Sequence, residues 1–321
     1  MIQDLKIGTR GSQLALYQAN WVKEKLIQAH PTLKVTLIKI KTTGDRIQDA
    51  PLAKIGGKGL FVKEIEEALI TRRIDLAVHS IKDVPTELPQ GLHLSAITKR
   101  EDPRDVFISG DGTLLKDLPQ GAKIGTSSLR RQAQLLHFRG DFEMVPLRGN
   151  LDTRLKKLRA MNLHGIVLAL AGVRRLGLES RITEIIPTEI SIPAIGQGAL
   201  GIEARVGDEE IEEHIRFLND PASSIAIIGE RAFLRRLEGG CQVPIAAFGR
   251  TVGSAIQMDG LVGTIDGKRL IRGHVEGALE EAEPLGIKLA EVLLMKGAGK
   301  ILDEIYQKSA PTISIENQNN G

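Results

Sequence analysis

Short apolar runs rich in β-branched residues alternate with helix-forming segments over the first two thirds of this chain, and this alternation restricts the fold more than any other feature. The apolar runs include LKIGT, VTLIKIKT, IDLAVHS, AKIGT and GIVLAL. Segments with helical patterning, such as SQLALYQANWVKEKLIQA and SLRRQAQLLH, lie between them. Strands separated by helices are typical of βα units around mostly parallel sheets, so the sequence predicts an α/β fold.

Two stretches interrupt this alternation, LHLSAITKREDPRDVFIS and IPAIGQGALGIEAR. The first breaks strand-like residues with charged and proline-containing turns, and the second resembles it. A chain that leaves one α/β lobe, builds another and returns would cross twice, so we expect two lobes joined by a double hinge. The predicted boundaries are 1–98 plus 195–218 for the first lobe and 99–194 for the second.

The character of the sequence changes after Asp220-Pro221. A helical segment, ASSIAIIGERAFLRRLEGG, precedes three short alternating strands and one long amphipathic segment, EPLGIKLAEVLLMKGAGKILDEIY, which is predicted to be a single helix. This order predicts a separate small α+β domain over residues 219–307. The polar residues 308–321 are predicted to form a flexible tail.

The composition excludes several classes of protein. The chain has one cysteine, which excludes a disulfide framework. Its beginning, MIQDLKIGTRGS, lacks the apolar core of a secretory signal. No run approaches the roughly 18–20 consecutive apolar residues that a membrane span needs. These features predict a cytoplasmic protein that does not bind membranes.

Positive charge is concentrated in one segment, although the formal net charge of the whole chain is only +3. Residues 123–181 hold 12 Lys and Arg against 4 Asp and Glu. This excess predicts an anionic ligand, and nucleic acid is the first alternative. Aromatic residues make up only 3% of the chain, which leaves few stacking platforms for single strands. A small polycarboxylate or phosphate therefore fits the pattern better.

Motifs for nucleotides and metals are absent from the sequence. GGKG lacks the spacing and the Ser or Thr of a P-loop, and GTRGS lacks the third glycine of a dinucleotide-binding fingerprint. The seven histidines are scattered, with no HExxH and no close set of His, Cys and carboxylates. No metal site is predicted.

Basic and hydroxyl residues recur where predicted strands lead into helices, which is where ligands bind in open α/β sheets. They are Arg10 with Ser12; Ser127 and Ser128 with Arg130 and Arg131; Arg148 with Arg154; and Arg174 with Arg175. Helix N-termini favour anions, and a guanidinium matches the shape of a carboxylate. One such arginine alone is more often a solvated surface residue, but the recurrence predicts a shared anion site.

Asp83 is the one acid expected to project into the same cleft, because it follows the strand IDLAVHS. Two interpretations stay open for it. Its carboxylate can neutralise the adjacent Lys82, or it can stay ionised and stabilise a cationic intermediate.

Cys241 also has two interpretations. A solitary cysteine is most often a small buried apolar side chain without chemistry of its own. The surrounding RRLEGGCQVPIAAFGR, however, places it behind two glycines and ahead of a proline, which indicates a loop that can face a cleft.

Six motifs together resemble the porphobilinogen deaminase family, also called the hydroxymethylbilane synthases. They are AVHSIKDVPT, GTSSLRRQAQL, LRGNLDTRLKKL, LAGVRRLGL, PAIGQGALGIEAR and LEGGCQVPIAAF, in register from about Lys6 to Gly249. The resemblance implies a transferase of tetrapyrrole (haem and porphyrin) biosynthesis. Such an enzyme condenses four porphobilinogen molecules stepwise, with loss of ammonia, and releases the linear tetrapyrrole hydroxymethylbilane. The C-terminal residues beyond Gly249 match the family only in general pattern.

The resemblance also implies roles for individual residues. A dipyrromethane cofactor would be attached covalently to Cys241 through a thioether, and Asp83 would be the catalytic carboxylate. The implied cofactor-binding residues are Cys241, Lys82, Asp83, Thr126, Ser127, Ser128, Arg130, Arg131 and Arg154. The implied substrate-binding residues are Arg10, Ser12, Phe61, Arg148, Arg175 and Gln197. Each added pyrrole carries an acetate and a propionate, which accounts for the arginines.

A non-catalytic anion-binding module is the main alternative, because two hinged lobes also occur in solute-binding proteins and regulatory effector domains. We therefore expect two periplasmic-binding-protein-like lobes joined by a double hinge, with the C-terminal domain carrying Cys241. Nothing in the sequence resembles a dedicated subunit interface, so a monomer is expected. No nucleic-acid partner is expected.

Overall fold

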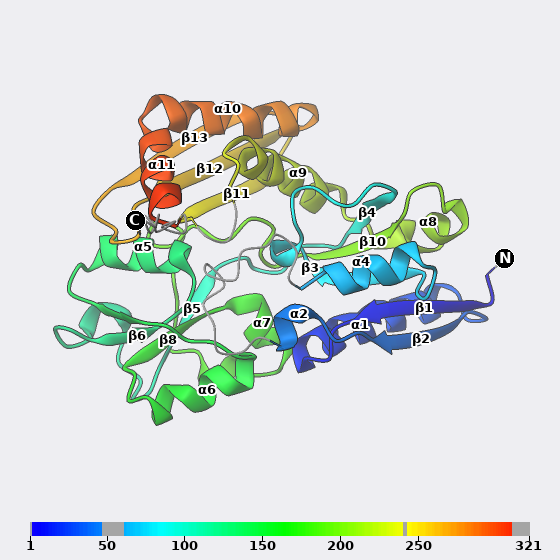
Figure 1. Ribbon diagram of the computed structural model, residues 1–321, viewed down its shortest axis with the longest axis horizontal. Helices are drawn as coiled ribbons and strands as arrows, with labels where there is room; N and C mark the ends of the chain where they lie inside the picture. Colours follow the sequence, from blue (N-terminus) through cyan, green and yellow to red (C-terminus); the bar gives the residue numbers. More distant parts are fainter. Residues whose placement is uncertain (1, 47–60, 240–242, 310–321) are drawn as a thin grey trace, which may run out of the picture.

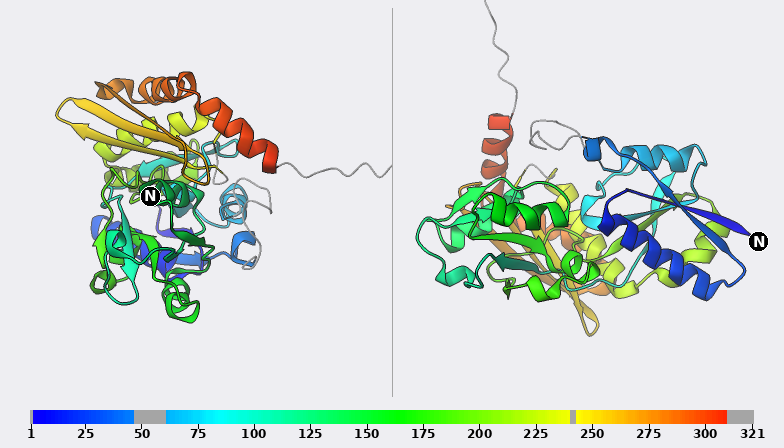
Figure 2. Two further views of the ribbon diagram at one scale, coloured as in Figure 1. Left: turned by 90° about the vertical axis from the view of Figure 1, so that its left-hand side faces the viewer. Right: turned by 90° about the horizontal axis from the view of Figure 1, so that it is seen from below.

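The computed structural model describes residues 2–46, 61–239 and 243–309 of the chain. Figure 1 shows three parts: a lobe built mainly from the N-terminal residues, a second lobe beside it, and a C-terminal domain that packs on both. Each part has its own sheet, and two of the three sheets have five strands. Figure 2 shows the C-terminal domain lying across the two lobes.

The first lobe contains a sheet with the strand order β2-β1-β3-β10-β4. Its strands are β1 (Asp4–Thr9), β2 (Lys34–Lys39), β3 (Leu76–Ser80), β4 (Leu92–Ile97) and β10 (Leu200–Arg205). β1 is parallel to β2 and β3, whereas β10 is antiparallel to β3 and β4. The parallel strands fix the edge at which their loops meet.

Helices cover both faces of this sheet. The helices are α1 (Gln13–Ala29), the short α2 (Thr43–Arg46), α4 (Lys63–Ile70) and α8 (Glu209–Ile215). α1 and α8 share one apolar core with alternate residues of the strands, such as Leu5 and Ile7. α4 packs on the opposite face through Ile65 and Leu69, which lie in a second core. Period-two alternation along the strands thus separates the two cores.

The second lobe contains a sheet with the strand order β7-β6-β8-β5-β9. The strands are β5 (Asp105–Ser109), β6 (Lys123–Gly125), β7 (Glu143–Val145), β8 (Gly165–Ala169) and β9 (Glu184–Ile185). The helices are α5 (Leu129–Phe138), α6 (Leu151–Ala160) and α7 (Leu170–Arg175). Leu135 of α5 packs with Phe107 on one face, and Leu158 of α6 packs with Val106 on the other.

The chain crosses between the lobes twice, once between β4 and β5 and once between β9 and β10. A buried ion pair joins these crossings to the C-terminal domain. Arg100, on the first crossing, donates from Nη2 to Glu230 Oε2 at 3.2 Å. Glu230 also accepts the backbone N–H of Gly196 on the second crossing at 2.6 Å and that of Gly249 at 2.7 Å. One carboxylate therefore holds three separate segments together.

The C-terminal domain is a three-stranded antiparallel sheet packed against helices. Its strands are β11 (Ile245–Val252), β12 (Ala255–Gly263) and β13 (Leu270–Ala278), and α9 (Pro221–Arg236), α10 (Ala282–Met295) and α11 (Ala298–Ser309) complete it. The prediction of one long final helix is wrong, because two helices occur there. Gly297 separates them with φ 97°, a left-handed conformation that glycine adopts without strain.

The predicted α/β class, the two lobes and the small C-terminal α+β domain are confirmed. The domain boundaries at residues 98, 194, 218 and 307 stay predictions. Residues 310–321 of the predicted tail, and residues 47–60 ahead of Phe61, lie outside the described residues.

Candidate active site

The candidate site begins at the carboxyl ends of β1 and β3 in the first lobe. Ser12 is the N-cap of α1 and accepts a hydrogen bond from the backbone N–H of Ala15 at 3.3 Å, as its place ahead of the helical pattern predicts. Arg10, Ser12, Phe61 and Asp83 line one pocket between α1, β3 and the start of α4. The structure therefore brings together residues from three separate parts of the sequence.

Arg10 is held from two sides. Its Nε donates to Asp45 Oδ1 at 3.1 Å, and its guanidinium carbon lies 4.3 Å from the centroid of the Phe61 ring. Burial raises the pKa of Asp45, but the hydrogen bond and the charge of Arg10 outweigh this effect and hold that pKa below its ordinary value. Arg10 is therefore placed by a carboxylate and an aromatic face, with an exposed fraction of 24%.

Asp83 ends a single 3-10 turn, η1 (Ile81–Asp83), that directly follows β3. Ile81 is buried, Lys82 is half-buried and Asp83 is exposed. Exposure therefore increases along these three residues. The Ile81 side chain packs in the core, and the next two residues face the cleft. Asp83 therefore lies just beyond the end of β3, where the strand pattern places it.

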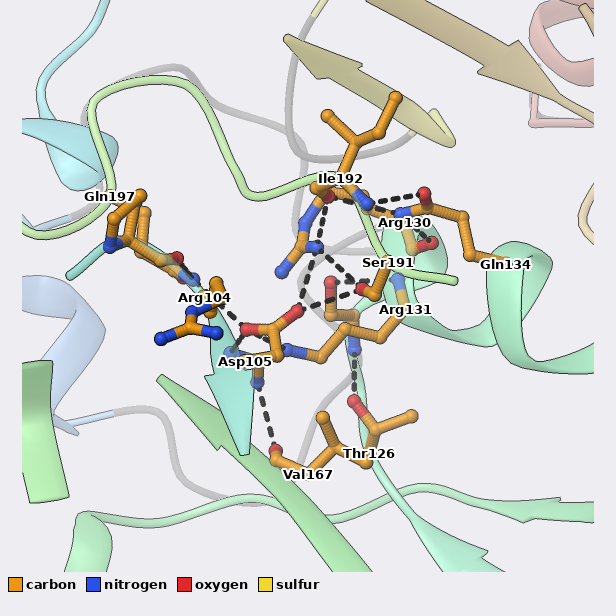
Figure 3. A network of polar contacts seen from close by, with 12 residues as sticks. Arg104, Asp105, Thr126, Arg130, Arg131, Gln134, Val167, Ser191, Ile192 and Gln197 are labelled. Atoms are coloured by element: carbon orange, nitrogen blue, oxygen red, sulfur yellow. Dashed lines mark hydrogen bonds and ion pairs between the residues drawn. The ribbon is translucent and has the colours of Figure 1, made fainter. Parts of the chain in front are cut away.

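Asp105, the first residue of β5, is a buried acceptor in the second lobe (Figure 3). Arg130 Nη1 donates to it at 2.8 Å, and Arg131 donates through Nη2 at 2.7 Å and Nε at 3.1 Å. Ser191 Oγ and Gln197 Nε2 donate at 3.0 and 2.9 Å. Burial raises the pKa of Asp105, but the two guanidinium charges outweigh it, so the pKa lies far below its ordinary value.

Arg130 and Arg131 are therefore engaged by the protein itself. Arg130 also donates to the Ile192 carbonyl at 2.7 Å, and Arg131 donates to the Val167 carbonyl at 2.9 Å. Both side chains are buried. Because two cations share one carboxylate, the trio keeps one net positive charge under the floor of the cleft. Sequence reasoning missed Asp105, whose only signal is an acid at the start of the apolar run DVFIS.

Gln197 connects this network to the Asp83 turn. Its amide nitrogen donates to Asp105, and its amide oxygen accepts from Lys82 Nζ at 3.3 Å. Burial lowers the pKa of Lys82 to about 8; the charge of Asp83 opposes this shift and that of Arg131 adds to it. The two lobes thus meet in one electrostatic group at the second crossing.

One more arginine of the second lobe interacts with this group. Burial lowers the pKa of Arg154, in α6, to about 10; the charges of Arg131 and Arg148 add to the shift and that of Asp83 opposes it. Arg154 Nε also donates to the Gly149 carbonyl at 2.8 Å. Together with Lys82, Arg130 and Arg131, Arg154 makes four cations around the carboxylates of Asp83 and Asp105.

The hydroxyl residues after β6 are arranged at the start of α5. Ser128 is the N-cap and accepts from the backbone N–H of Arg131 at 3.4 Å, and Thr126 Oγ1 accepts from the N–H of Ser128 at 3.2 Å. Both hydroxyls accept in these bonds, so their own protons are left to donate to an anion. Ser127 donates to the Leu147 carbonyl at 3.0 Å.

Arg174 and Arg175 lie in the last turn of α7, so the prediction that they head a helix is wrong. The helix includes Leu170 and begins earlier than the pattern indicated. At a helix C-terminus the dipole favours a cation, which removes the objection raised against arginines at helix starts. Arg175 Nη2 donates to the Gly198 carbonyl on the second crossing at 2.6 Å.

Cys241 lies outside the described residues.

Among the described residues, no group of three or more His, Cys, Asp or Glu side chains is placed to hold a metal ion. Within the same part of the chain, none of the helices combines the length and apolar character needed to cross a bilayer. What the site offers is a set of cations, hydroxyl donors and one exposed carboxylate. This arrangement can bind a ligand with several carboxylates and stabilise positive charge at one point.

Comparison with known proteins gives consistent matches. Residues 5–213 match the family model described as porphobilinogen deaminase, dipyromethane cofactor binding domain, and residues 224–295 match the porphobilinogen deaminase C-terminal domain. The porphobilinogen deaminases of Geotalea daltonii and Geotalea uraniireducens are each 58% identical to this chain over 96% of both sequences.

Among solved structures, the periplasmic aliphatic sulphonate binding protein SsuA from Escherichia coli aligns with 74% of this chain and 71% of its own, at 14% identity and a TM-score of 0.40. The family is decided by the sequence matches, which cover both the two lobes and the C-terminal domain. This chain belongs to the porphobilinogen deaminase family.

Proposed function

We propose that this protein is a hydroxymethylbilane synthase, which condenses four porphobilinogen molecules onto a dipyrromethane primer and releases hydroxymethylbilane with loss of ammonia. The observation that carries this function is the group of four cations, Lys82, Arg130, Arg131 and Arg154, around the carboxylates of Asp83 and Asp105. Family membership supports the same reaction and places the protein in tetrapyrrole biosynthesis.

The residues present fit a dipyrromethane. Each pyrrole carries an acetate and a propionate, and the cations at the cleft outnumber the protein carboxylates there. Arg154, Lys82 and the hydroxyls of Thr126 and Ser128 are the groups that would hold the acidic side arms of the cofactor. When bound, the cofactor would supply the nucleophilic carbon that the first substrate molecule joins.

Arg130 and Arg131 support the cofactor side of the site, mainly as a source of positive potential. Their strongest bonds go to Asp105, so their charge reaches the cleft while their positions stay fixed. Because these charges are already in position, little reorganisation energy is needed when an anion binds. The substrate or the growing chain is proposed to bind to six further residues: Arg10, Ser12, Phe61, Arg148, Arg175 and Gln197.

Asp83 is proposed as the catalytic carboxylate. Loss of ammonia from the aminomethyl arm of porphobilinogen leaves positive charge on the substrate. The exposed Asp83 carboxylate can accept hydrogen bonds from pyrrole N–H groups and offset that positive charge. Lys82, beside it, can exchange a proton near neutral pH because burial lowers its pKa to about 8.

Replacing Asp83 with Asn tests this role. We expect kcat to fall by about 10²–10³-fold, because the charge is lost while the shape is kept. The matched control is Asp117→Asn, since Asp117 is likewise an exposed acid that ends a 3-10 turn, η2 (Leu115–Asp117). Equal turnover of Asp83→Asn and wild type on porphobilinogen would favour the non-catalytic anion-binding module.

Cys241 is proposed to carry the cofactor through a thioether. A thiolate is a strong nucleophile even at an ordinary pKa, and a tethered primer makes each condensation effectively intramolecular. Intact-mass spectrometry of purified protein should give the bare chain plus one dipyrromethane, and Cys241→Ser should give the bare chain. Active wild-type protein with the mass of the bare chain would disprove the tether.

The protein is further proposed to act as a monomer in the cytoplasm without a nucleic-acid partner. Arg130 and Arg131, two of the basic residues that suggested nucleic acid, are buried and paired with Asp105. Sedimentation at several protein concentrations tests the monomer. Steeply salt-dependent binding to single or double strands would contradict the absence of a nucleic-acid partner.

A further inference from the structure

The turn that carries Asp83 is fixed from its buried side. Ile81 is 1% exposed and shares a core with Ile227 of α9, Ile97 and Ala199. The fit is close, since a Cβ added at Gly196 would collide with the Ile81 side chain. One end of the turn therefore rests against a helix of the C-terminal domain.

The other end of the turn is held by the same helix. Arg231 lies four residues after Ile227, which is one helical turn further along α9. Its Nη1 donates to the Val84 carbonyl at 3.2 Å and its Nη2 donates to the Pro85 carbonyl at 2.6 Å. These two carbonyls directly follow Asp83. A planar guanidinium can bridge two adjacent carbonyls in this way, whereas an ammonium is a single point donor.

Arg231 is buried and keeps its charge. Only 8% of the residue is exposed, and burial lowers its pKa to about 10; the charge of Arg235 adds to the shift and that of Glu203 opposes it. At neutral pH the guanidinium therefore stays protonated, and both of its carbonyl bonds are charge-assisted. Removing it would leave the carbonyls of buried Val84 and partly buried Pro85 with one donor fewer each.

The residue before Arg231 fixes the helix in turn. Glu230 accepts from Arg100 on the first crossing and from Gly196 on the second. α9 ends at Arg236, five residues before Cys241 in the chain. Consecutive residues of one helix thus hold both crossings and the Asp83 turn, a short distance in sequence from the proposed cofactor attachment point.

We infer that Arg231 is a positioning residue of the active site, which acts from the C-terminal domain by holding the backbone after Asp83. The inference rests on the proposed function of Asp83 but not on its chemical details. Its effect is on turnover, because a catalytic group misplaced by about 1 Å can cost about 10²-fold in rate. Binding of substrate by the arginines of the cleft is left intact.

The test compares Arg231→Met and Arg231→Gln with Arg236→Met in full-length holoenzyme. Arg236 lies on the same helix but pairs with Glu291 at the surface, so its replacement controls for loss of a helix arginine. Intact mass establishes that each variant carries the cofactor. We expect kcat of both Arg231 variants to fall about 10- to 100-fold with KM changed less than about twofold, and Arg236→Met to match wild type.

Hydrogen exchange gives a readout independent of activity. The Val84 N–H donates to the Ile81 carbonyl at 3.0 Å within the turn, so its exchange should accelerate in the Arg231 variants while that of β11–β13 stays unchanged. Wild-type kcat in a folded, loaded Arg231 variant, or unchanged Val84 exchange, would overturn the inference. If Arg231→Met does not fold, Arg231→Gln, which keeps one donor, decides by the same two measurements. If the wild type itself did not turn over porphobilinogen, the proposed function would be disproved. The exchange rate of the Val84 N–H would still test whether Arg231 positions the Asp83 turn.

Discussion

At the scale of single residues, buried charge determines how this protein is built. Asp105 is fully buried and accepts from two guanidinium groups, a hydroxyl and an amide. Such a carboxylate is tolerated only because its lone pairs are occupied, and its partners are tolerated only because it is there. The candidate site is thus supported by an ion network that is buried almost completely.

Replacing Asp105 with Asn should therefore destabilise the fold severely. We expect a loss of about 3–5 kcal/mol in the free energy of unfolding, because two buried guanidinium charges lose their counter-ion. Urea unfolding measures this loss. The control is Asp141→Asn in the same lobe, which breaks the more exposed pair with Arg139 and should cost far less. Similar losses for the two variants would contradict the role assigned to Asp105.

A second buried group makes stability depend on pH. Glu66 of α4 faces His79 and Glu203, and His79 Nε2 lies 2.9 Å from Glu203 Oε2. Among the described residues, Glu66 Oε1 and Glu203 Oε1 are buried without a hydrogen-bond partner. Burial raises the pKa of Glu66 to about 7; the charge of Glu203 adds to this shift and His79 opposes it.

Because the pKa of Glu66 is higher in the folded protein than its ordinary value, the folded state binds this proton more tightly than the unfolded chain. The stability it contributes is present at acidic pH and is lost as pH rises through about 7. Glu66→Gln should remove this dependence and be more stable than wild type at pH 8.5 by on the order of 1–2 kcal/mol. Urea unfolding between about pH 5.5 and 8.5 measures the free energy of unfolding of both proteins. If this free energy changed with pH equally in Glu66→Gln and wild type, the prediction would be refuted.

At the scale of elements, short connections do as much as helices and strands. The turn η1 and the second crossing pack on each other at Gly196, which has φ 68° and no room for a Cβ beside Ile81. The geometry of Asp83 therefore depends on a glycine more than 100 residues away. α9 then holds both segments through Ile227, Glu230 and Arg231.

Gly196→Ala should displace Ile81 and with it the Asp83 turn. Gly207→Ala is the matched control, because Gly207 also has a positive φ, 77°, but open space around its Cβ position. Both variants should lose about 1 kcal/mol from backbone strain, and Gly196→Ala should lose about 1–3 kcal/mol more from overpacking. We also expect only Gly196→Ala to lower kcat. Equal effects in thermal unfolding and in turnover would show that the contact with Ile81 is unimportant.

At the scale of the whole molecule, charge is distributed unevenly between surface and cleft. The chain has a formal net charge of only +3, yet residues 123–181 carry most of the basic excess. The first lobe adds Lys82 and Arg10 to the arginines of the second. Cations from both lobes therefore meet around the carboxylates of Asp83 and Asp105, and this arrangement attracts small carboxylates.

This field should appear as a salt effect on KM. Raising the ionic strength from about 0.1 to 1 M shortens the screening length from about 10 Å to about 3 Å, so KM for porphobilinogen should rise roughly threefold or more. The effect on kcat should be small, because salt screens charges in contact with a bound ligand less than it screens exposed charges. Steady-state kinetics in NaCl and in a second monovalent salt measure the effect. A KM that does not change with salt would contradict an electrostatic role for the cleft.

The sequence predicted the site unevenly. Ser12 and Ser128 were identified as helix starts because an N-cap is a local signal, and both cap their helices. Asp83 was placed at a strand end because its strand pattern is also local. Asp105 was missed, since an acid at the start of an apolar run becomes a counter-ion only when Arg130 and Arg131 fold onto it. The helix break at Gly297 was missed because helical periodicity continues on both sides of it.

The sequence by itself determined the α/β class, the two-lobed plan with its C-terminal domain, and the family, because periodicity, capping and motif spacing are properties of adjacent residues. Only the tertiary structure decided which guanidinium groups face the cleft and which bind Asp105, that Gln197 links Lys82 to this carboxylate, and that Arg231 holds the backbone after Asp83. These pairings join residues distant in the chain, and their energies depend on burial that no local pattern contains.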